Sequence, residues 1–370
     1  MRVAVLGHTY IVRANRGKYR ALERRGHQVL LCSPRLWRET DFGLRTFESD
    51  DRLDAAAFSC PFHGRVRRYW YPRGELLAAL RGWRPDALVA ETEPGGLAAL
   101  EAVWAATRLG LPLLPFSWEN LPLTGWSRLA ALPVYRAARR LLVGSGGAAL
   151  VARRAGYRGP LTVIPQVGVD PARIPPRRAA GPASPPTVLF LGRLDRKKGA
   201  DLLLDALAAA PAWRGLIIGD GAERGNLEAH AARLRLGDRV TFRAAVSHEE
   251  VPAVLTGADA LALPSRTVPG WAEQFGHVLA WAMAAGLPIV ASRCGAIPEV
   301  VGDAGLLCAE NAAPELAAAL ERLTDGATWR QLAENGRRRA AARFTDEAVA
   351  ARLEQALRLA WERNDADFGL

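Results

Sequence analysis

The stretch Glu273-Gln-Phe-Gly-His-Val-Leu-Ala-Trp-Ala-Met-Ala-Ala-Gly-Leu-Pro-Ile-Val-Ala-Ser292 is the most informative part of this chain. Its pattern predicts a loop, a helix of two to three turns, a glycine stop and a buried strand. Glu273 and Gly276 lie where this helix begins, so backbone N–H groups and the positive end of the helix dipole point at whatever occupies the loop. The stretch therefore indicates a binding site for a phosphate or a polyhydroxy ligand.

Strand and helix patterns alternate along the chain on both sides of this stretch. Short apolar runs predict strands at Val3–Leu6, Gln28–Cys32, Asp86–Ala90, Leu111–Phe116, Leu141–Val143, Leu161–Ile164, Thr187–Leu191, Gly215–Ile218, Arg239–Phe242, Ala258–Leu263, Pro288–Ala291 and Gly305–Leu307. Segments with helical spacing lie between most of them. This alternation is typical of α/β folds whose parallel sheets are built from βαβ units.

The stretch Asp170–Pro186 interrupts the alternation with six prolines and predicts a linker between two domains. We expect an N-terminal domain over residues 1–175, a second domain over 176–345, and a last helix over 346–370 that packs back on the N-terminal domain. Both domains are expected to be doubly wound and to face each other across a cleft. Ligands bind at the carboxyl ends of parallel strands, so this cleft is the predicted site.

The composition fits a protein of two ordinary domains. The chain of 370 residues contains no apolar run long enough to span a bilayer. Its first residues follow a strand pattern rather than that of a signal peptide, so we expect a cytoplasmic location. The four cysteines are scattered and have no histidine partner at metal spacing, which argues against a disulfide framework and against a metal site.

The charge is distributed unevenly. Residues 1–180 hold 28 of the 49 Lys and Arg residues but only 14 of the 38 Asp and Glu residues. A basic half beside a slightly acidic half suggests an anionic surface or an anionic ligand on one side. Genome composition is the alternative explanation for the preference for arginine, although it does not explain the asymmetry. Only Lys18, Lys197 and Lys198 are lysines.

Two turns of the second domain carry further candidate ligand groups. Gly192-Arg-Leu-Asp-Arg-Lys-Lys-Gly199 combines backbone donors with Arg193 and Lys198, a guanidinium fork and a point charge that suit a diphosphate. Gly219-Asp-Gly221 lets a ligand approach the backbone closely. Structural explanations remain open for each feature: a solvated basic turn, ordinary loop geometry, and a helix cap in the case of Glu273.

Taken in order, the motifs resemble those of glycosyltransferase family 4. The resemblance covers the whole chain and is strongest over residues 187–305. Its motifs there are G-R-L-x-x-x-K-G, G-D-G, Pro264-Ser265 at a strand end, E-x-F-G, A-M-A-x-G-x-P-x-V-x-S, and G-x-x-P-E at Gly295–Glu299. In the first half, His8-Thr-Tyr10, Pro85-Asp86, Glu93-Pro94 and Ile164–Asp170 resemble a branch of the family seen in bacterial surface-polysaccharide gene sets.

This resemblance implies the GT-B fold of two Rossmann-like domains and a retaining transfer of a sugar from a nucleoside-diphosphate sugar. By analogy, Arg193 and Lys198 hold the diphosphate and stabilise the leaving charge, while Glu273 holds the hexose hydroxyls. The other residues expected to bind the donor are Gly192, Gly219, Gly221, Val246, Ser265, Gln274, Phe275, Gly276 and Trp281; those expected to bind the acceptor are His8, Glu93, Glu119 and Asn120. No cofactor and no metal ion are expected, because the cations and the helix dipole balance the diphosphate charge.

Two positions depart from the family pattern. Family members usually carry E-x₇-E, whose second Glu binds the ribose, but Trp281 stands at that position. Many members also carry a His after the strand that corresponds to Leu111–Phe116, and the segment Pro115–Asn120 has none. Trp281 leaves open a non-catalytic relative that binds a sugar nucleotide or a glycan. A phosphorylase or an epimerase on the same fold is a further alternative.

The expected partners are a nucleotide-sugar donor and a glycan, lipid-linked or small-molecule acceptor. The segment Arg65–Tyr71 mixes arginines with aromatic residues and suggests contact with an anionic membrane or acceptor. We therefore expect a cytoplasmic protein with peripheral contact at the inner membrane face. No recognition motif supports nucleic-acid binding. Glu91 and Glu93 both follow a predicted strand, and one of them is expected to bind acceptor hydroxyls.

Overall fold

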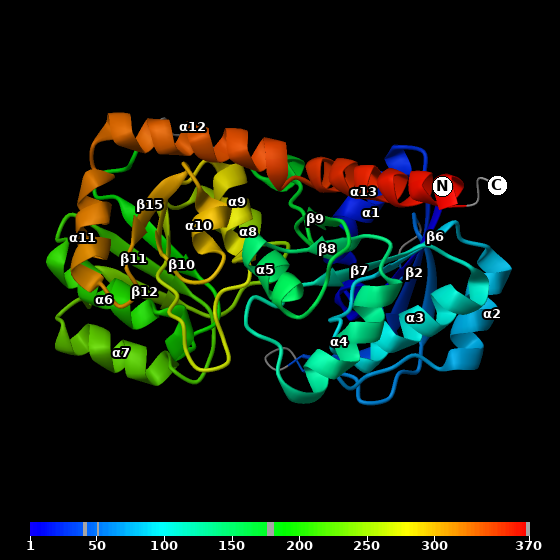
Figure 1. The fold of residues 1–370 in the computed structure, drawn as a ribbon. Coiled ribbons are helices and arrows are strands. Elements are labelled where there is room, and N and C mark those ends of the chain that lie inside the picture. The colour runs from blue at the N-terminus through cyan, green and yellow to red at the C-terminus, as the bar shows by residue number, and fades with distance from the viewer. Residues whose placement is uncertain (40–42, 50–51, 176–180, 368–370) are drawn as a thin grey trace. The chain divides into compact units, whose positions relative to one another are not determined.

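The structure is a computed structural model that describes residues 1–39, 43–49, 52–175 and 181–367, with side chains as far as residue 362. The chain divides into two compact units (Figure 1). Unit 1 comprises Met1–Gly168 and Asp346–Leu370, and unit 2 comprises Val169–Thr345. No helix among the described residues combines the length and the apolar character that crossing a bilayer requires.

The boundary lies seven residues before the one expected from the proline-rich stretch. Val169 pairs with Thr345 in an isolated parallel bridge, and its N–H donates to the carbonyl of Phe344 at 2.9 Å. These contacts join the two ends of unit 2 to each other. Residues 176–180 of the expected linker lie outside the described residues.

Unit 1 is built on a seven-stranded sheet in which all neighbours are parallel. The order is β5-β2-β1-β6-β7-β8-β9. Its strands are β1 (Arg2–Leu6), β2 (Gln28–Pro34), β5 (Asp54–Phe58), β6 (Ala87–Ala90), β7 (Leu113–Ser117), β8 (Leu141–Val143) and β9 (Leu161–Val163). A separate antiparallel hairpin pairs β3 (Leu36–Glu39) with β4 (Gly43–Thr46). The strand order reverses between β1 and β6, which defines the point where ligands bind in such sheets.

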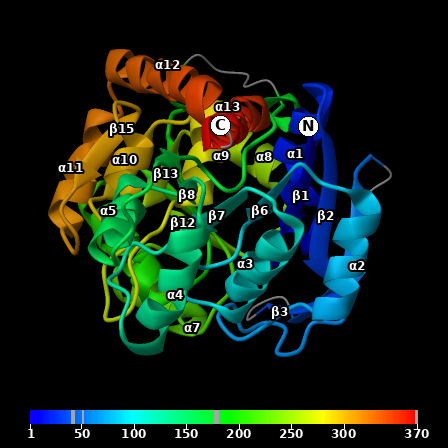
Figure 2. The same ribbon diagram turned by 45° about the vertical axis from the view of Figure 1, so that its right-hand side comes forward.

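The helices of unit 1 cover both faces of this sheet. They are η1 (His8–Ile11), η2 (Arg13–Arg16), α1 (Gly17–Arg24), α2 (Arg73–Trp83), α3 (Leu97–Leu109), α4 (Gly125–Ala137), α5 (Gly146–Arg154) and α13 (Asp346–Asp367). Side chains alternate along a strand, so Val3 and Val5 of β1 pack with α1 and α13, whereas Ala4 and Leu6 pack with α2 and α3. The last helix, α13, thus lies alongside α1 in unit 1 (Figures 1 and 2).

Unit 2 contains a second parallel sheet, of six strands in the order β12-β11-β10-β13-β14-β15. The strands are β10 (Thr187–Leu191), β11 (Arg214–Ile218), β12 (Val240–Arg243), β13 (Ala260–Leu263), β14 (Ile289–Ser292) and β15 (Gly305–Cys308). The chain moves outward from β10 to β12 and then returns to the other side of β10. The strand order therefore reverses between β10 and β13.

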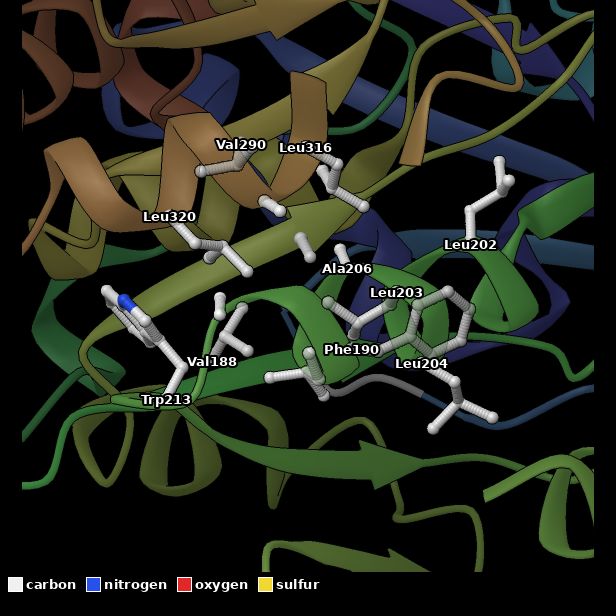
Figure 3. Packing of buried hydrophobic residues seen from close by; sticks show 14 of the residues in the cluster. Val188, Phe190, Leu202, Leu203, Leu204, Ala206, Trp213, Val290, Leu316 and Leu320 are labelled. Carbon is white, nitrogen blue, oxygen red and sulfur yellow. The ribbon is translucent and has the colours of Figure 1, made fainter. Parts of the chain in front are cut away.

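Helices also cover both faces of the second sheet. They are η3 (Pro171–Arg173), η4 (Arg196–Lys198), α6 (Ala200–Ala209), α7 (Arg224–Arg233), α8 (Val251–Thr256), α9 (His277–Ala285), α10 (Ile297–Val301), α11 (Ala313–Arg322) and α12 (Gly326–Arg343). Figure 3 shows one face, where Leu203 of α6 and Leu320 of α11 pack around Val188 and Trp213. The α/β prediction with two doubly wound domains is confirmed.

Candidate functional site

The predicted donor residues of unit 2 gather at the carboxyl ends of β10 and β13. The turn after β10 carries Arg193 and Lys198, and the loop after β13 runs from Pro264 to the start of α9. The two strands are neighbours, so both loops leave the same edge of the sheet where the strand order reverses. This edge is the position at which doubly wound sheets bind their ligands.

A charged pair joins these two loops. Lys198 Nζ lies 2.6 Å from Glu273 Oε2, and the Ser265 hydroxyl donates to the same oxygen at 3.1 Å. The Lys198 side chain is 19% exposed and that of Glu273 is 8% exposed. A hydrogen bond between two ions is short and strong. In this pair the lysine side chain remains partly exposed to solvent.

Arg193 has a different partner, since its Nη2 lies 2.7 Å from Asp195 Oδ2 within the same turn. Its side chain is 42% exposed. Sequence reasoning gave no role to Trp271, although the ammonium groups of Lys197 and Lys198 lie 5.0 and 4.9 Å from the centroid of its ring. Trp271 therefore contributes a π face to both lysines.

The G-D-G turn has a packing role. A side chain on Gly219 would collide with the carbonyl of Gly192, and one on Gly221 would approach the carbonyl of Leu194 to 2.6 Å. Asp220 joins this turn to the loop after β12, because its carboxylate accepts the N–H of Ala245 at 2.9 Å. The half-buried Val246 follows in that loop. The turns after β10, β11 and β12 thus lie against one another at the sheet edge.

Helix α9 begins at His277, directly after Gly276, which adopts a left-handed conformation with φ +71°. The side chain of Phe275 is buried and packs edge-to-face on Phe344, with ring centroids 5.6 Å apart. Gln274 is half-buried beside it. The ring of Phe275 is therefore a packing group of unit 2.

Trp281 is packed into unit 2 and is only 3% exposed. His248 and His277 meet its ring edge-on, with centroids 5.9 and 6.3 Å away, and the guanidinium of Arg173 lies 5.7 Å over it. Burial lowers the pKa of His248, which favours the neutral imidazole. Among the described residues, no partner accepts a hydrogen bond from the Trp281 indole N–H.

In unit 1, His8 follows β1 and lies in an aromatic cluster. Its ring stacks on Trp37 at a centroid distance of 4.3 Å and meets Tyr69 edge-on at 5.7 Å. Burial lowers the pKa of His8 to about 4, so the imidazole is neutral at pH 7. The segment Arg65–Tyr71, expected to touch a membrane, instead buries Tyr69 and Tyr71 completely. These two tyrosines belong to the core and not to an external surface.

Glu93 and Glu119 come together at the carboxyl ends of β6 and β7. The carboxylate of Glu93 accepts the Ser117 hydroxyl at 3.2 Å and the Trp118 N–H at 3.0 Å. Burial, with a smaller contribution from the charge of Glu119, raises the pKa of Glu93 to about 8. Glu119 is ion-paired with Arg67, and Asn120 follows Glu119 in the same loop.

Glu91 is not available to an acceptor. It is fully buried and ion-paired with Lys18, and it also accepts the hydroxyls of Tyr10 and Tyr19. Burial lowers the pKa of Lys18, an effect that Glu91 opposes. Of the two carboxylates considered from the sequence, Glu91 is buried and Glu93 is half-buried. The pair of Lys18 and Glu91, 73 residues apart, had no local signal that could have revealed it.

Comparison with known proteins identifies the family. The model described as "Glycosyltransferase Family 4" matches residues 18–173, and that described as "Glycosyl transferases group 1" matches residues 176–339, so the two together span most of the chain. The chain belongs to glycosyltransferase family 4. The resemblance inferred from the motifs is confirmed.

Several curated relatives are glycosyltransferases. The 2-deoxystreptamine glucosyltransferase of Streptomyces kanamyceticus is 35% identical over 146 residues, which cover 38% of this chain and 36% of that protein. The sulfoquinovosyl transferase of Arabidopsis thaliana is 26% identical over 276 residues, which cover 68% of this chain and 51% of that protein. This chain thus spans about a third to a half of the length of these relatives.

Solved structures match nearly the whole chain. A sucrose-phosphate synthase from Thermosynechococcus elongatus has a TM-score of 0.73 at 24% identity and covers 98% of this chain and 100% of its own. An Anabaena protein, HepE, in complex with UDP and glucose has a TM-score of 0.71 at 21% identity, with coverage of 97% and 99%. The GT-B fold of this family-4 chain is therefore confirmed.

Proposed function

We propose that this family-4 chain is a retaining glycosyltransferase that moves a sugar from a nucleoside-diphosphate sugar to an acceptor. The observation that supports it most strongly is the pair of Lys198 and Glu273, joined at 2.6 Å where the strand order of unit 2 reverses. A cation for the phosphates and a carboxylate for sugar hydroxyls lie side by side there. The cation can stabilise the charge of a leaving diphosphate, and the carboxylate can orient the sugar.

The chemistry follows from the donors that remain available. An ammonium group has three N–H donors, and the bonds described for Lys198 are those to Glu273, so its other donors can reach diphosphate oxygens. Arg193 adds a guanidinium fork at the same edge, and the backbone at the start of α9 adds N–H groups. These charges stabilise the negative charge that develops on the leaving diphosphate.

Glu273 is proposed to accept hydrogen bonds from the donor sugar. Its backbone is fixed on both sides, since its N–H lies 3.5 Å from Cys294 Sγ and its carbonyl accepts the N–H of Ala296 at 2.8 Å. A carboxylate held in this way is positioned before the sugar arrives, which lowers the entropic cost of binding. Ser265 and Lys198 both donate to Oε2 of this carboxylate, which fixes its orientation.

The donor is proposed to be a nucleotide sugar, with UDP as the first nucleotide to test. Structural neighbours have been solved with UDP and with UDP-glucose. The acceptor is proposed to be a glycan, a lipid-linked sugar or a small molecule bound by unit 1, near Glu93, Glu119 and Asn120. We propose transfer without a metal ion, because the described residues include no group of three or more metal-ligating side chains.

We also propose a cytoplasmic location with peripheral contact to an anionic membrane face. The excess of arginine in residues 1–180 supports this proposal. Trp126 and Leu129, which lie three residues apart on α4, are 65% and 61% exposed and supply an apolar contact beside that charge.

The function is tested by mixing UDP-sugars with candidate acceptors and measuring release of UDP, first with and then without EDTA. Transfer that persists in EDTA, with the anomeric configuration retained in the product, is the expected result. Nucleotide binding with no release of UDP for any acceptor would favour the non-catalytic alternative suggested by Trp281. The proposal fails if no nucleoside diphosphate raises the unfolding temperature, since a ligand at a hundred times its dissociation constant stabilises by about 2.7 kcal/mol.

A further inference from the structure

The turn after β10 and the loop after β13 are joined by more than the pair of Lys198 and Glu273. The backbone N–H of Arg266, in that loop, donates to the carbonyl of Lys197 at 2.8 Å. The Arg266 guanidinium reaches further, since its Nη2 lies 2.8 and 2.9 Å from the two carboxylate oxygens of Asp201 in the first turn of α6. Arg266 therefore binds the chain both just before and just after Lys198.

The Arg266 side chain is largely removed from solvent. It is 10% exposed, whereas the side chain of its partner Asp201 is 40% exposed. A guanidinium in such a position costs free energy unless a carboxylate and hydrogen bonds compensate for the lost water. A buried ion pair often stabilises a fold no better than apolar side chains of the same size would, but its directional hydrogen bonds specify one geometry.

The turn and the loop also approach each other too closely for a side chain. Gly199 has φ +76°, and a Cβ there would lie 2.0 Å from the carbonyl oxygen of Pro264. Gly199 directly follows Lys198, and Pro264 lies two residues before Arg266. Lys198 is thus flanked along the chain by two contacts with the loop, one at Lys197 and one at Gly199.

The loop that receives these contacts is itself anchored to the sheet. The N–H of Thr267 donates to Glu310 Oε2 at 2.6 Å, and its hydroxyl donates to Oε1 of the same carboxylate at 2.8 Å. The carbonyl of Ser265 accepts the hydroxyl of Ser292. The residues on both sides of Arg266 therefore bind β14 and the segment after β15, so Arg266 extends from a fixed support.

We propose that Arg266 is a positioning residue that, through Asp201, holds the ammonium group of Lys198 in the donor site. The inference rests on the proposed function, since it concerns the cation that binds the diphosphate in that reaction. Lysine carries its charge on a flexible stem whose ordering costs entropy. A turn that is fixed on both sides of Lys198 presents the ammonium group in one place before the diphosphate arrives, which lowers the entropic cost of binding.

Calorimetric titration of UDP into variants of the full chain tests this role. Asp201→Asn removes the charge that holds the guanidinium and should weaken UDP binding by about three- to tenfold, a factor within the range of coupling inside one hydrogen-bond network. Arg266→Met should weaken it at least as much. Arg266→Lys keeps the positive charge and should weaken it less than Arg266→Met does.

Asp205→Asn is the matched control. Asp205 lies one turn further along α6, its side chain is 41% exposed, and it pairs with His230 rather than with the loop after β13. UDP binding should be unchanged in this variant. Asp201→Asn alters a side chain of equal exposure, so it keeps the proposal testable if a variant of the buried Arg266 fails to fold.

A double-mutant cycle separates positioning from a general loss of structure. If Arg266 acts through Lys198, Asp201→Asn should weaken UDP binding in the wild-type background and have no further effect in the Lys198→Ala background. A loss by the same factor in both backgrounds would overturn the inference, because the pair would then act independently of Lys198. Unchanged UDP binding in Asp201→Asn and Arg266→Met would overturn it as well.

These outcomes are distinct from a failure of the proposed function. A wild-type chain that binds UDP as tightly as Asp201→Asn does contradicts only the positioning role. A wild-type chain that binds no nucleoside diphosphate contradicts the proposed function itself and the inference with it.

Discussion

Among the described residues, each unit contains one lysine–glutamate pair, and the two pairs differ in their contact with solvent. Lys18 and Glu91 of unit 1 are 2% and 0% exposed, and two tyrosine hydroxyls complete the hydrogen bonds of the carboxylate. Lys198 and Glu273 of unit 2 are 19% and 8% exposed and lie at the edge of a sheet. The same pair of side chains is therefore sealed from solvent in unit 1 and partly exposed to solvent in unit 2.

The rarity of lysine strengthens this comparison. Only three of the 49 basic residues are lysines, and two of these form the pairs. A compact ammonium fits a single carboxylate in a confined space, whereas the broad guanidinium fork of arginine requires a planar partner and more room. We infer that lysine persists in this arginine-rich chain where the geometry requires a point charge.

The largest expected effect is on the stability of unit 1. Lys18→Met leaves the Glu91 carboxylate buried without its cation, which should lower the free energy of unfolding by about 3–5 kcal/mol. Denaturant unfolding measures this change. The double variant Lys18→Met/Glu91→Leu should recover part of the loss, because it removes both charges. A loss below about 1 kcal/mol in the single variant would place Lys18 among ordinary surface charges.

The second prediction concerns how unit 2 binds the ribose of the nucleotide, and not the two lysine–glutamate pairs. Trp281 stands where the family carries a ribose-binding carboxylate, and an indole offers one N–H donor and no acceptor oxygen. We expect wild-type protein to bind UDP and its 2′- and 3′-deoxy forms with similar dissociation constants. Trp281→Glu should favour the ribose form but lower stability, because the ring is buried against His248 and His277.

If wild-type protein binds UDP more than about a hundredfold more tightly than its deoxy forms, another residue binds the ribose hydroxyls. No binding of either form in wild type or variant would indicate a pseudoenzyme.

A third prediction concerns the pH dependence of the free energy of unfolding, to which Glu93 should contribute. Glu91, two residues earlier, is fully buried in its ion pair with Lys18. The pKa of Glu93 in the folded state is about 8, above its unfolded value, so its contribution to stability is complete at low pH and is lost as pH rises toward 8. His8, with its pKa lowered to about 4, has the opposite sign and contributes stability that is lost as pH falls below about 6.5.

Below about pH 6.5, the contributions of Glu93 and His8 to the pH dependence of unfolding oppose each other. Between about pH 6.5 and 8, only the contribution of Glu93 remains. Unfolding free energy should therefore decline there by at most about 1.4 kcal/mol per pH unit. Glu93→Gln should remove this decline, and an unchanged slope in that variant would mean that Glu93 does not titrate in this range.

The smallest expected effect is at the membrane. The full chain should sediment with anionic vesicles at low salt, because each well-placed arginine adds about 1 kcal/mol to the binding free energy. Replacing Trp126 and Leu129 by Ala should reduce sedimentation several-fold, while Leu359→Ala on α13, which is 39% exposed, should not. Equal binding to neutral and anionic vesicles would leave the arginine excess as a matter of composition.

Sequence reasoning succeeded where the structure is local. The turn after β10 and the loop before α9 each combine a strand end, glycines and a helix start within a short stretch, so their positions follow from the pattern. It failed for β5, α2 and α4, which have weak patterns: β5 is rich in alanine, α2 contains Gly74 and Gly82, and α4 contains Pro133. Tertiary packing stabilises these elements where their intrinsic propensity does not.

The pairs themselves could not be predicted in full. Glu273 and Lys198 were assigned to one site through the resemblance, but their direct contact depends on β10 and β13 being neighbours. The contacts of Glu93 with Glu119 and of Lys18 with Glu91 likewise depend on strand order and not on local spacing. The sequence predicts which residues are available, and the topology decides which of them meet.

The contrast between the two pairs is tested most directly by calorimetric titration of UDP into Lys198→Ala and Lys197→Ala. Lys197 is a matched control, because it lies over the same Trp271 ring but contacts Asp195, at 3.6 Å, rather than Glu273. Loss of a charge-assisted bond of about 1.5–3 kcal/mol should weaken UDP binding by roughly 10- to 150-fold in Lys198→Ala and only slightly in Lys197→Ala. Equal affinity in both variants and wild type would contradict the assignment of Lys198 to the diphosphate.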